Sequence, residues 1–205
     1  LYLHPTKWKR HAAEFSEKMR NTMSKPLSAL FGRSSHADKV SDVLSAMKGG
    51  NEQSIQDFKQ ILDAYIYSVS IMSNRDSNDN PNAITVSSVT SISMEPPSIL
   101  ICINKSSKIH DSIVLGSKFC INLLTKDQHE LSNICSDDQK HDQRFADQNW
   151  NLDNLPFLKN AQANIFCKVD KLSSYHTHTI VIGLVEDANF ADTISTLTYV
   201  DGDYK

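Results

Sequence analysis

Short β-forming runs dominate the chain after Tyr65. They are rich in Val, Ile, Thr, Phe and Tyr, and polar turn clusters such as Asn74–Asn82 separate them. Only two short helical patterns interrupt them, at Lys108–Gly116 and Asp127–Cys135. Most connections are too short or too polar for repeated parallel crossovers, so the pattern predicts a mainly antiparallel β fold with a few helices. The expected strands are 65–73, 83–93, 98–103, 118–124, 162–170, 178–186 and 196–200.

The N-terminal quarter differs from the rest in pattern and in charge. Residues 1–50 hold nine Lys and Arg against four Asp and Glu, whereas residues 51–205 hold twelve against twenty. Apolar side chains at helical spacing predict two helices before Gly49-Gly50 and a third one after it. We therefore expect a helical basic extension over 1–50 and a main domain over 51–205. The extension has no aromatic platform or reader motif for nucleic acid, so we expect it to pack on the acidic main domain or on a partner subunit.

The small number of glycines excludes two classes of nucleotide-binding protein, the Rossmann dinucleotide-binding proteins and the P-loop proteins. The six glycines are too scattered to form G-x-G-x-x-G or a P-loop, and no G-x-S-x-G elbow is present. No apolar run approaches the ~20 residues that a membrane helix needs, and the first thirty residues lack the apolar stretch of a signal peptide. The expectation is a cytoplasmic protein with neither a membrane nor a nucleic acid as partner.

Metal and thiol chemistry have little support. With 40% hydrophobic residues, the chain can bury a core without disulfides or a structural metal. A strand would place His176 and His178 on one face as a conceivable metal pair, but no third ligand is near them. We therefore expect no metal. The cysteines have no Cys-x-x-Cys spacing and are expected to be core residues; they are Cys102, Cys120, Cys135 and Cys167.

Residues 98–108 carry the clearest binding signal. An apolar strand ends at Ile103 and leads directly into a polar segment before an expected helix, namely Asn104, Lys105, Ser106, Ser107 and Lys108. Hydroxyls, ammonium groups and the backbone N–H groups of a helix start suit a phosphate ester without any glycine loop. The alternative is a capped helix with its lysines in solvent. The preceding run, 83–93, is rich in hydroxyls and beside an anion site could line a flat heteroaromatic ring, although alone it is merely a good strand former.

These stretches together resemble the flavin reductase-like family, the reductase components of two-component flavin monooxygenases. The resemblance covers about residues 58–205 and leaves 1–50 outside. It departs from the family at Ala83 and Ser68, where glycine is usual, and at Thr177 and Leu184, where an acidic residue is usual. The matching segments are Thr85–Asp111 with its Pro96-Pro97 pair, Lys118–Leu124, Asp127–Leu131, Arg144–Ala146 with Trp150, His178–Gly183, Leu197–Tyr199 and Gly202–Tyr204.

The resemblance implies a split β-barrel of antiparallel Greek-key type that forms a homodimer, with FMN or FAD near the dimer interface. By carry-over from the family, Thr85, Val86, Ser87 and Ser88 line the isoalloxazine ring. By the same carry-over, the ribityl phosphate is bound by Asn104, Lys105, Ser106 and Ser107, and the neighbouring wall of the site is formed by Phe119 and Asn122. His178, the catalytic candidate, is placed where the nicotinamide of NADH or NADPH approaches, and it orients the nicotinamide or the developing reduced flavin through a hydrogen bond rather than acting as an acid. The alternative is a histidine at the barrel rim that only satisfies backbone groups.

The leading hypothesis is therefore an NAD(P)H:flavin oxidoreductase that releases reduced FMN or FAD to a partner monooxygenase. The alternative is a non-catalytic flavin-binding or electron-transfer module within a larger assembly. A third hypothesis has residues 1–50 dock the monooxygenase. No local sequence pattern chooses FMN over FAD, or NADH over NADPH.

Overall fold

The computed structural model describes residues 52–205. The basic extension and the two helices expected before Gly49 lie outside the described residues. The helix expected after the glycine pair is confirmed, because residues 52–63 are helical, and Phe58 on its apolar side is 59% exposed. The chain divides into two compact units, Leu1–Lys59 and Gln60–Lys205. Among the described residues, no helix is both long enough and apolar enough to cross a bilayer.

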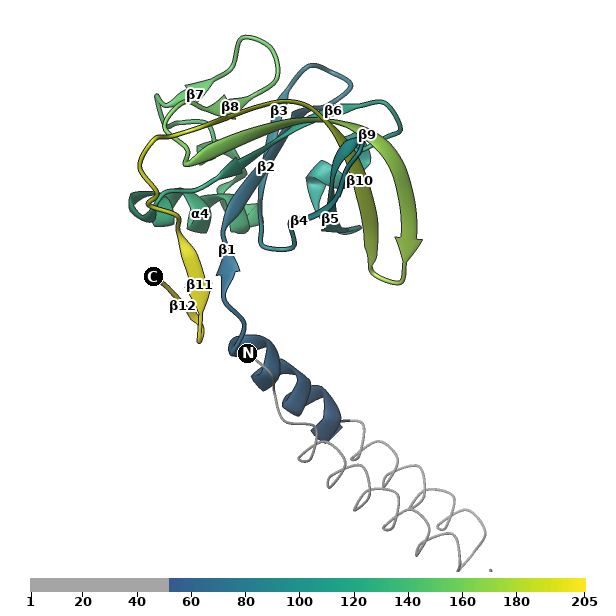
Figure 1. Ribbon diagram of the computed structural model, residues 1–205, viewed down its shortest axis with the longest axis vertical. Coiled ribbons are helices and arrows are strands. Elements are labelled where there is room, and N and C mark those ends of the chain that lie inside the picture. Colours follow the sequence, from purple (N-terminus) through teal and green to yellow (C-terminus); the bar gives the residue numbers. More distant parts are fainter. Residues whose placement is uncertain (1–51) are drawn as a thin grey trace, which may run out of the picture. The chain divides into compact units, whose positions relative to one another are not determined.

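A seven-stranded antiparallel sheet forms the body of the second unit (Figure 1). Its spatial order is β3-β2-β6-β9-β10-β5-β4. No ladder joins the edge strands β3 and β4 in the part of the chain that the structure describes, so the sheet does not close into a barrel. The unit is mainly β, as expected. Its strands are β2 (Ser70–Arg75), β3 (Pro81–Val86), β4 (Thr90–Met94), β5 (Pro97–Asn104), β6 (Lys118–Leu123), β9 (Ala163–Tyr175) and β10 (His178–Phe190).

Two small sheets and four short helices complete the unit. One sheet joins β1 (Tyr67–Ser68), β11 (Thr198–Val200) and β12 (Asp203–Tyr204), and the other joins β7 (Trp150–Asn151) to β8 (Phe157–Leu158). Asp201 and Gly202 both have positive φ, as the two-residue turn between β11 and β12 requires. The helices are η1 (Lys108–Ser112), η2 (Lys126–Gln128), α4 (His129–Ser136) and η3 (Asp138–Gln143), of which only α4 is an α-helix.

The period-two pattern of the strands divides the interior into two cores. On β2, Met72 belongs to a cluster that also contains Phe119 and Val181, whereas the next residue back, Ile71, belongs to a second cluster. The second cluster contains Leu131 and other residues of and around α4. The sheet is therefore covered on both faces near β2 and β3, which places α4 beside the end of β3.

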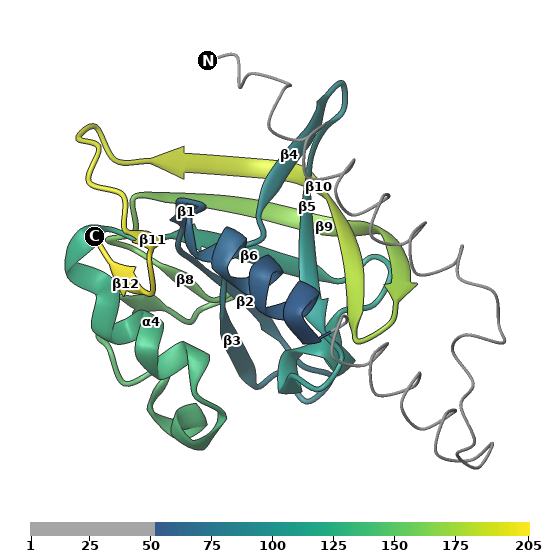
Figure 2. The same cartoon turned by 90° about the horizontal axis from the view of Figure 1, so that it is seen from below.

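The structure differs from the expected strands in one place that matters for the site. The run 83–93 is two strands, because the chain leaves β3 after Val86 and enters β4 at Thr90. The hydroxyl of Ser88 bonds to both the backbone N–H and the carbonyl of Cys102 on β5, at 3.1 and 3.3 Å. This side chain substitutes for ladder hydrogen bonds, which a propensity pattern does not register. In addition, β9 and β10 run side by side well beyond their expected ends (Figure 2).

Candidate functional site

The segment that follows β5 forms a tight polar loop. Asn104 Oδ1 accepts hydrogen bonds from the backbone N–H and the hydroxyl of Ser106, both at 3.0 Å. The hydroxyl of Ser107 donates to the backbone carbonyl of Asn104 at 2.6 Å. Ser107 is buried, whereas residues 104–106 are exposed. The loop is thus held in one shape by its own side chains while its outer surface stays open to a ligand.

Lys105 ties this loop to the turn between β9 and β10. Its ammonium group donates to the hydroxyl of Ser174 at 2.7 Å and to the carbonyl of His176 at 2.6 Å, and its backbone N–H donates to Thr177. No carboxylate pairs with Lys105 among residues 52–205. The positive charge is therefore anchored by neutral acceptors and remains uncompensated, which suits an anion.

His178 lies beside the same loop. It is the first residue of β10, and the antiparallel register places it directly opposite Asn104 on β5. The Thr177 hydroxyl lies 2.9 Å from His178 Nδ1, and the side chain is partly exposed. His176 instead occupies the turn with a φ of 45°, so the two histidines do not share a strand face as the metal interpretation required. No metal-binding cluster occurs within the described residues.

The residues expected around a flat ring are divided between two locations. Thr85 donates its hydroxyl to the carbonyl of Ser132 on α4 at 2.7 Å, and Ser87 is exposed. Ser88 lies against β5 through Cys102, two residues before Asn104. Val86 is 7% exposed and its side chain packs into the main core. The stretch 85–88 therefore runs from α4 toward the polar loop.

The two residues expected in the neighbouring wall lie in the interior. Phe119 is completely buried, and its ring lies against Gly183 of β10. Asn122 is also completely buried and uses its amide fully, donating to the Ile71 carbonyl and the Ser73 hydroxyl and accepting from the Leu158 N–H. Neither side chain lines a described pocket. They fix the strands behind the surface and do not form the surface itself.

A pocket of about 510 Å³ opens beside Thr85 and Ser87. Its wall also carries two tyrosines, Tyr199 and Tyr204, whose rings meet edge to face at 5.3 Å. The Tyr204 hydroxyl lies 2.9 Å from the Ser132 hydroxyl, so α4 holds both the threonine and the tyrosine. Aromatic faces with hydroxyls at the edge suit a flat, polar-edged ring. Sequence reasoning assigned no role to these tyrosines, although both end segments of the family resemblance.

All four cysteines were expected to be core residues, and three of them, Cys120, Cys135 and Cys167, are buried. Burial raises the pKa of Cys135 and of Cys167 to about 12 and raises that of Cys120 further. These thiols are therefore protonated at neutral pH and are not nucleophiles. Cys102 is only partly buried and holds Ser88 through its backbone. The site offers hydroxyls, amides, one ammonium group and one imidazole, which is a binding set for a phosphorylated ring compound.

The fold and the site therefore define a mainly β, antiparallel protein with an exposed, lysine-bearing polar loop beside a histidine. A family model described as flavin reductase like domain matches residues 62–205. The chain belongs to this flavin reductase-like family, and the resemblance noted in its sequence is confirmed.

Two curated relatives illustrate the range of the family. The reductase component of the FADH(2)-dependent resorcinol hydroxylase of Rhizobium sp. (strain MTP-10005) is 37% identical over 125 residues, covering 60% of this chain and 70% of that protein. The FMN reductase (NADH) RutF of Pseudomonas syringae pv. syringae (strain B728a) is 31% identical over 117 residues, covering 56% and 66%. One of these relatives is named for FADH(2) and the other for FMN.

Solved structures share the fold. The NADH:FAD oxidoreductase SgcE6 of Streptomyces globisporus C-1027, in complex with NAD and FAD fragments, has a TM-score of 0.67 at 22% identity, covering 75% of this chain and 92% of that one. The styrene monooxygenase flavin reductase SMOB of Pseudomonas putida S12 has a TM-score of 0.63 at 24% identity, covering 73% and 96%. At these identities the match establishes the fold alone.

Proposed function

We propose that this chain is an NAD(P)H-dependent flavin reductase that supplies reduced FMN or FAD to a partner monooxygenase. Membership of the flavin reductase-like family carries this conclusion. The relative named FMN reductase (NADH) supports flavin reduction, and the relative named as the reductase component of a hydroxylase supports supply of reduced flavin to a partner. When bound, the flavin supplies the acceptor for the hydride that the nicotinamide donates, so the protein needs no nucleophile of its own.

The polar loop after β5 is proposed to hold the ribityl phosphate. Lys105 supplies a charge that no carboxylate in the described part of the chain neutralises, and Ser106 supplies an exposed N–H and hydroxyl. Asn104 and Ser107 keep the loop in shape through the bonds between them. This donor set fits a phosphate ester, because a cation and hydroxyls converge on one exposed loop.

The ring is proposed to lie along 85–88, where hydroxyls can meet its polar edge. Thr85, Ser87 and Ser88 carry these hydroxyls, and Val86 contributes its backbone. Phe119 and Asn122 act from behind by fixing the sheet. His178 is proposed to orient the nicotinamide: Thr177 engages Nδ1, and Nε2 has no hydrogen bond within residues 52–205.

The assembly is proposed to be a homodimer of split β-barrels of Greek-key type, with the flavin near the interface. Ile92 and Met94 on the edge strand β4 are 46% and 78% exposed, and Phe190 at the end of β10 is 81% exposed, so this side of the sheet has apolar surface to bury. We further propose that residues 1–50 form a separate basic extension and residues 51–205 the reductase domain. The proposed location is the cytoplasm, where NAD(P)H is available.

Anaerobic stopped-flow absorbance in the visible flavin band tests the function. Protein with FMN or FAD is mixed with NADH and then with NADPH, and rapid, saturable bleaching far above the protein-free rate is expected. Bound flavin that stays oxidised with both nucleotides would instead establish a flavin-carrying module.

Lys105→Met tests the phosphate site separately. The variant should bind FMN about tenfold more weakly, which corresponds to loss of one charge-assisted contact, and should bind riboflavin as the wild type does because riboflavin has no phosphate. Equal weakening of both ligands would show that Lys105 supports the fold and not the phosphate.

A further inference from the structure

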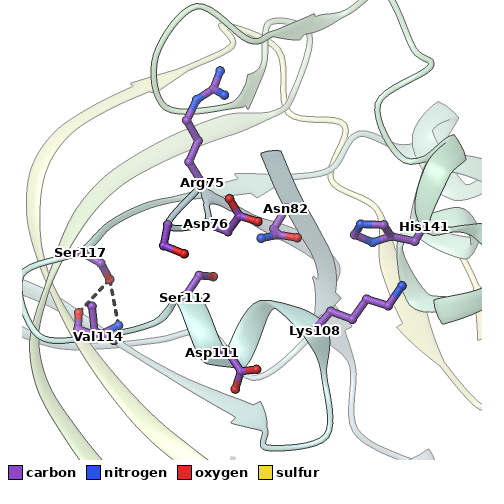
Figure 3. A pocket seen from close by; sticks show the side chains of 10 residues that line it. Arg75, Asp76, Asn82, Lys108, Asp111, Ser112, Val114, Ser117 and His141 are labelled. Atoms are coloured by element: carbon purple, nitrogen blue, oxygen red, sulfur yellow. Dashed lines mark hydrogen bonds between the residues drawn. The ribbon is translucent and has the colours of Figure 1, made fainter. Parts of the chain in front are cut away.

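A second pocket, of about 600 Å³, lies beside η1 and is formed by the β2–β3 turn and η3 (Figure 3). It shares no lining residue with the pocket beside Thr85. Its size falls within the roughly 300–1,000 Å³ of small-molecule sites. Figure 3 shows Lys108 extending toward His141, with Asn82 lying between Asp76 and His141. Neither the loop 104–107 nor His178 lines this pocket, so the proposed flavin ring and phosphate sites do not account for it.

Two charged residues on one side of this pocket are already occupied by the protein. The Arg75 guanidinium donates to three backbone carbonyls. The Asp76 carboxylate accepts from the backbone N–H groups of Asn78 and Asn80 and from the Asn80 amide, and these hydrogen bonds lower its pKa. Asp76 holds the β2–β3 turn, and Arg75 ties that turn to the connection between β7 and β8 through Leu152 and Asn154. The other carboxylate, Asp111, has a side chain that is 98% exposed at the rim.

Three other residues that line the pocket make no side-chain hydrogen bond within residues 52–205. Asn82 is only 8% exposed, yet its side-chain amide makes no hydrogen bond within residues 52–205. His141 Nδ1 is a buried atom with no partner there. Lys108 has neither an ion pair nor a hydrogen bond in the same part of the chain. Of these three groups, His141 Nδ1 is the buried atom without a partner, whereas Lys108 is exposed to solvent. A buried polar atom without a partner is unfavourable unless a ligand satisfies it, so His141 Nδ1 indicates a binding site whose lining also contains Lys108 and Asn82.

The unused wall is cationic. Burial lowers the pKa of His141, and the charges of Lys108 and Arg144 lower it further, so its imidazole is neutral at pH 7. Lys108 therefore supplies the positive charge, while the imidazole and the Asn82 amide supply hydrogen bonds. A cation with neutral donors suits a phosphate group.

The two lysines of the polar segment, Lys105 and Lys108, contact different parts of the protein. Lys105 turns toward the β9–β10 turn, whereas Lys108, three residues on, turns into this pocket. The loop 104–107 that we assign to the ribityl phosphate contains Lys105 and directly precedes Lys108, the first residue of η1. This adjacency in the chain relates the pocket to a ligand that continues past that phosphate. FAD continues there with a second phosphate and an adenosine, whereas FMN ends at the first phosphate.

We propose that this pocket receives the adenylate half of FAD, with Lys108, Asn82 and His141 meeting its phosphate, so that the protein binds FAD in preference to FMN. This inference rests on the proposed flavin reductase function. It deepens that function by assigning the flavin substrate, which the sequence pattern alone does not choose.

The test compares affinities for FAD and FMN, measured by equilibrium quenching of flavin fluorescence. The wild-type protein should bind FAD more tightly than FMN. Lys108→Met should reduce the ratio of FAD to FMN affinity about tenfold, or ~1.4 kcal/mol. The control Lys159→Met removes an exposed lysine that lines neither pocket and should leave the ratio as it is. An unchanged ratio in Lys108→Met would overturn the proposal.

A second variant and a second ligand make the result independent of any one substitution. Asn82→Asp keeps the shape and adds a negative charge, so it should lower the same ratio while circular dichroism shows an unaltered fold. Equilibrium dialysis with ADP, which has the adenylate but no flavin, should show binding that Lys108→Met weakens and Lys159→Met does not.

The outcomes separate this inference from the proposed function. If the flavins bind with an unchanged ratio and ADP is not retained, the pocket assignment fails and the reductase function stands. If neither flavin binds, both the function and the FAD assignment fail. If inorganic phosphate displaces ADP at equal concentration, the pocket recognises phosphate alone and the adenylate assignment is overturned.

Discussion

Gly183 is the position where the packing behind the site leaves no space for a side chain. A Cβ atom there would stand 2.5 Å from Phe119 Cζ, 2.9 Å from Phe119 Cε1 and 3.1 Å from Cys167 Cβ. Phe119 is completely buried, so its ring has no solvent to move into. Inserting a methyl into a packed core costs roughly 1–3 kcal/mol. With two ring atoms inside 3 Å, we expect Gly183→Ala to lose about 3 kcal/mol of unfolding free energy.

Urea unfolding followed by circular dichroism measures this loss, and a melting temperature should fall by about 2–4 °C per kcal/mol. The double variant Gly183→Ala with Phe119→Leu removes the clashing ring atoms. It should be more stable than the sum of the two single variants predicts by about 1 kcal/mol or more. As a control, Gly202→Ala has nothing within 4 Å but a φ of 74°, so its cost of about 1–2 kcal/mol should not depend on Phe119. Additive behaviour of the first pair would refute the packing argument.

Three further results are expected. Arg144→Met should cost about 3 kcal/mol in urea unfolding, because the buried guanidinium donates to the Ala83 carbonyl at 2.6 Å and its loss leaves that acceptor unpaired; a loss below 1 kcal/mol would contradict this. The lowered pKa of His141 means that the unfolded chain binds its proton more readily, so stability should fall as pH drops below about 6.5, and His141→Asn should flatten that fall in melts across pH. His178→Ala should slow NADH-dependent bleaching at least tenfold while flavin affinity stays the same, and equal loss of flavin affinity would assign it to flavin binding instead.

Most strands were predictable because their alternation is local. The runs that became β5 and β6 end within one residue of their expected bounds, since each is apolar on its buried side and bounded by polar turns. The break at 87–89 was not predictable, because it depends on the Ser88 hydroxyl reaching Cys102 on another strand. The end of β10 was missed for a related reason: residues 186–190 are exposed and three of the five are polar, and their strand conformation depends on pairing with β9. The end of β9, residues 171–175, likewise depends on pairing with the start of β10.

The candidate site was predictable where its polar residues are neighbours in the sequence. The loop 104–107 joins a buried strand to the start of a helix, and its polar side chains are consecutive in the sequence. That His178 lies opposite Asn104 depends on the β5–β10 register, which a single sequence does not specify. The burial of Asn122 was missed because its partners, including Leu158, are distant in the chain. That Lys108 lines a pocket together with His141 likewise depends on the position of η3.

Lys105 has a consequence for how two nucleotides share this protein. A lysine ammonium carries three N–H donors, and two of them hold the β9–β10 turn through Ser174 and His176. The third is available to an anion without releasing the turn. A phosphate bound there restrains Lys105 and, through it, the backbone that leads into His178. Because such coupling is reciprocal, a flavin phosphate on the loop should raise the affinity for the nicotinamide nucleotide by the same factor as the nicotinamide raises that for flavin.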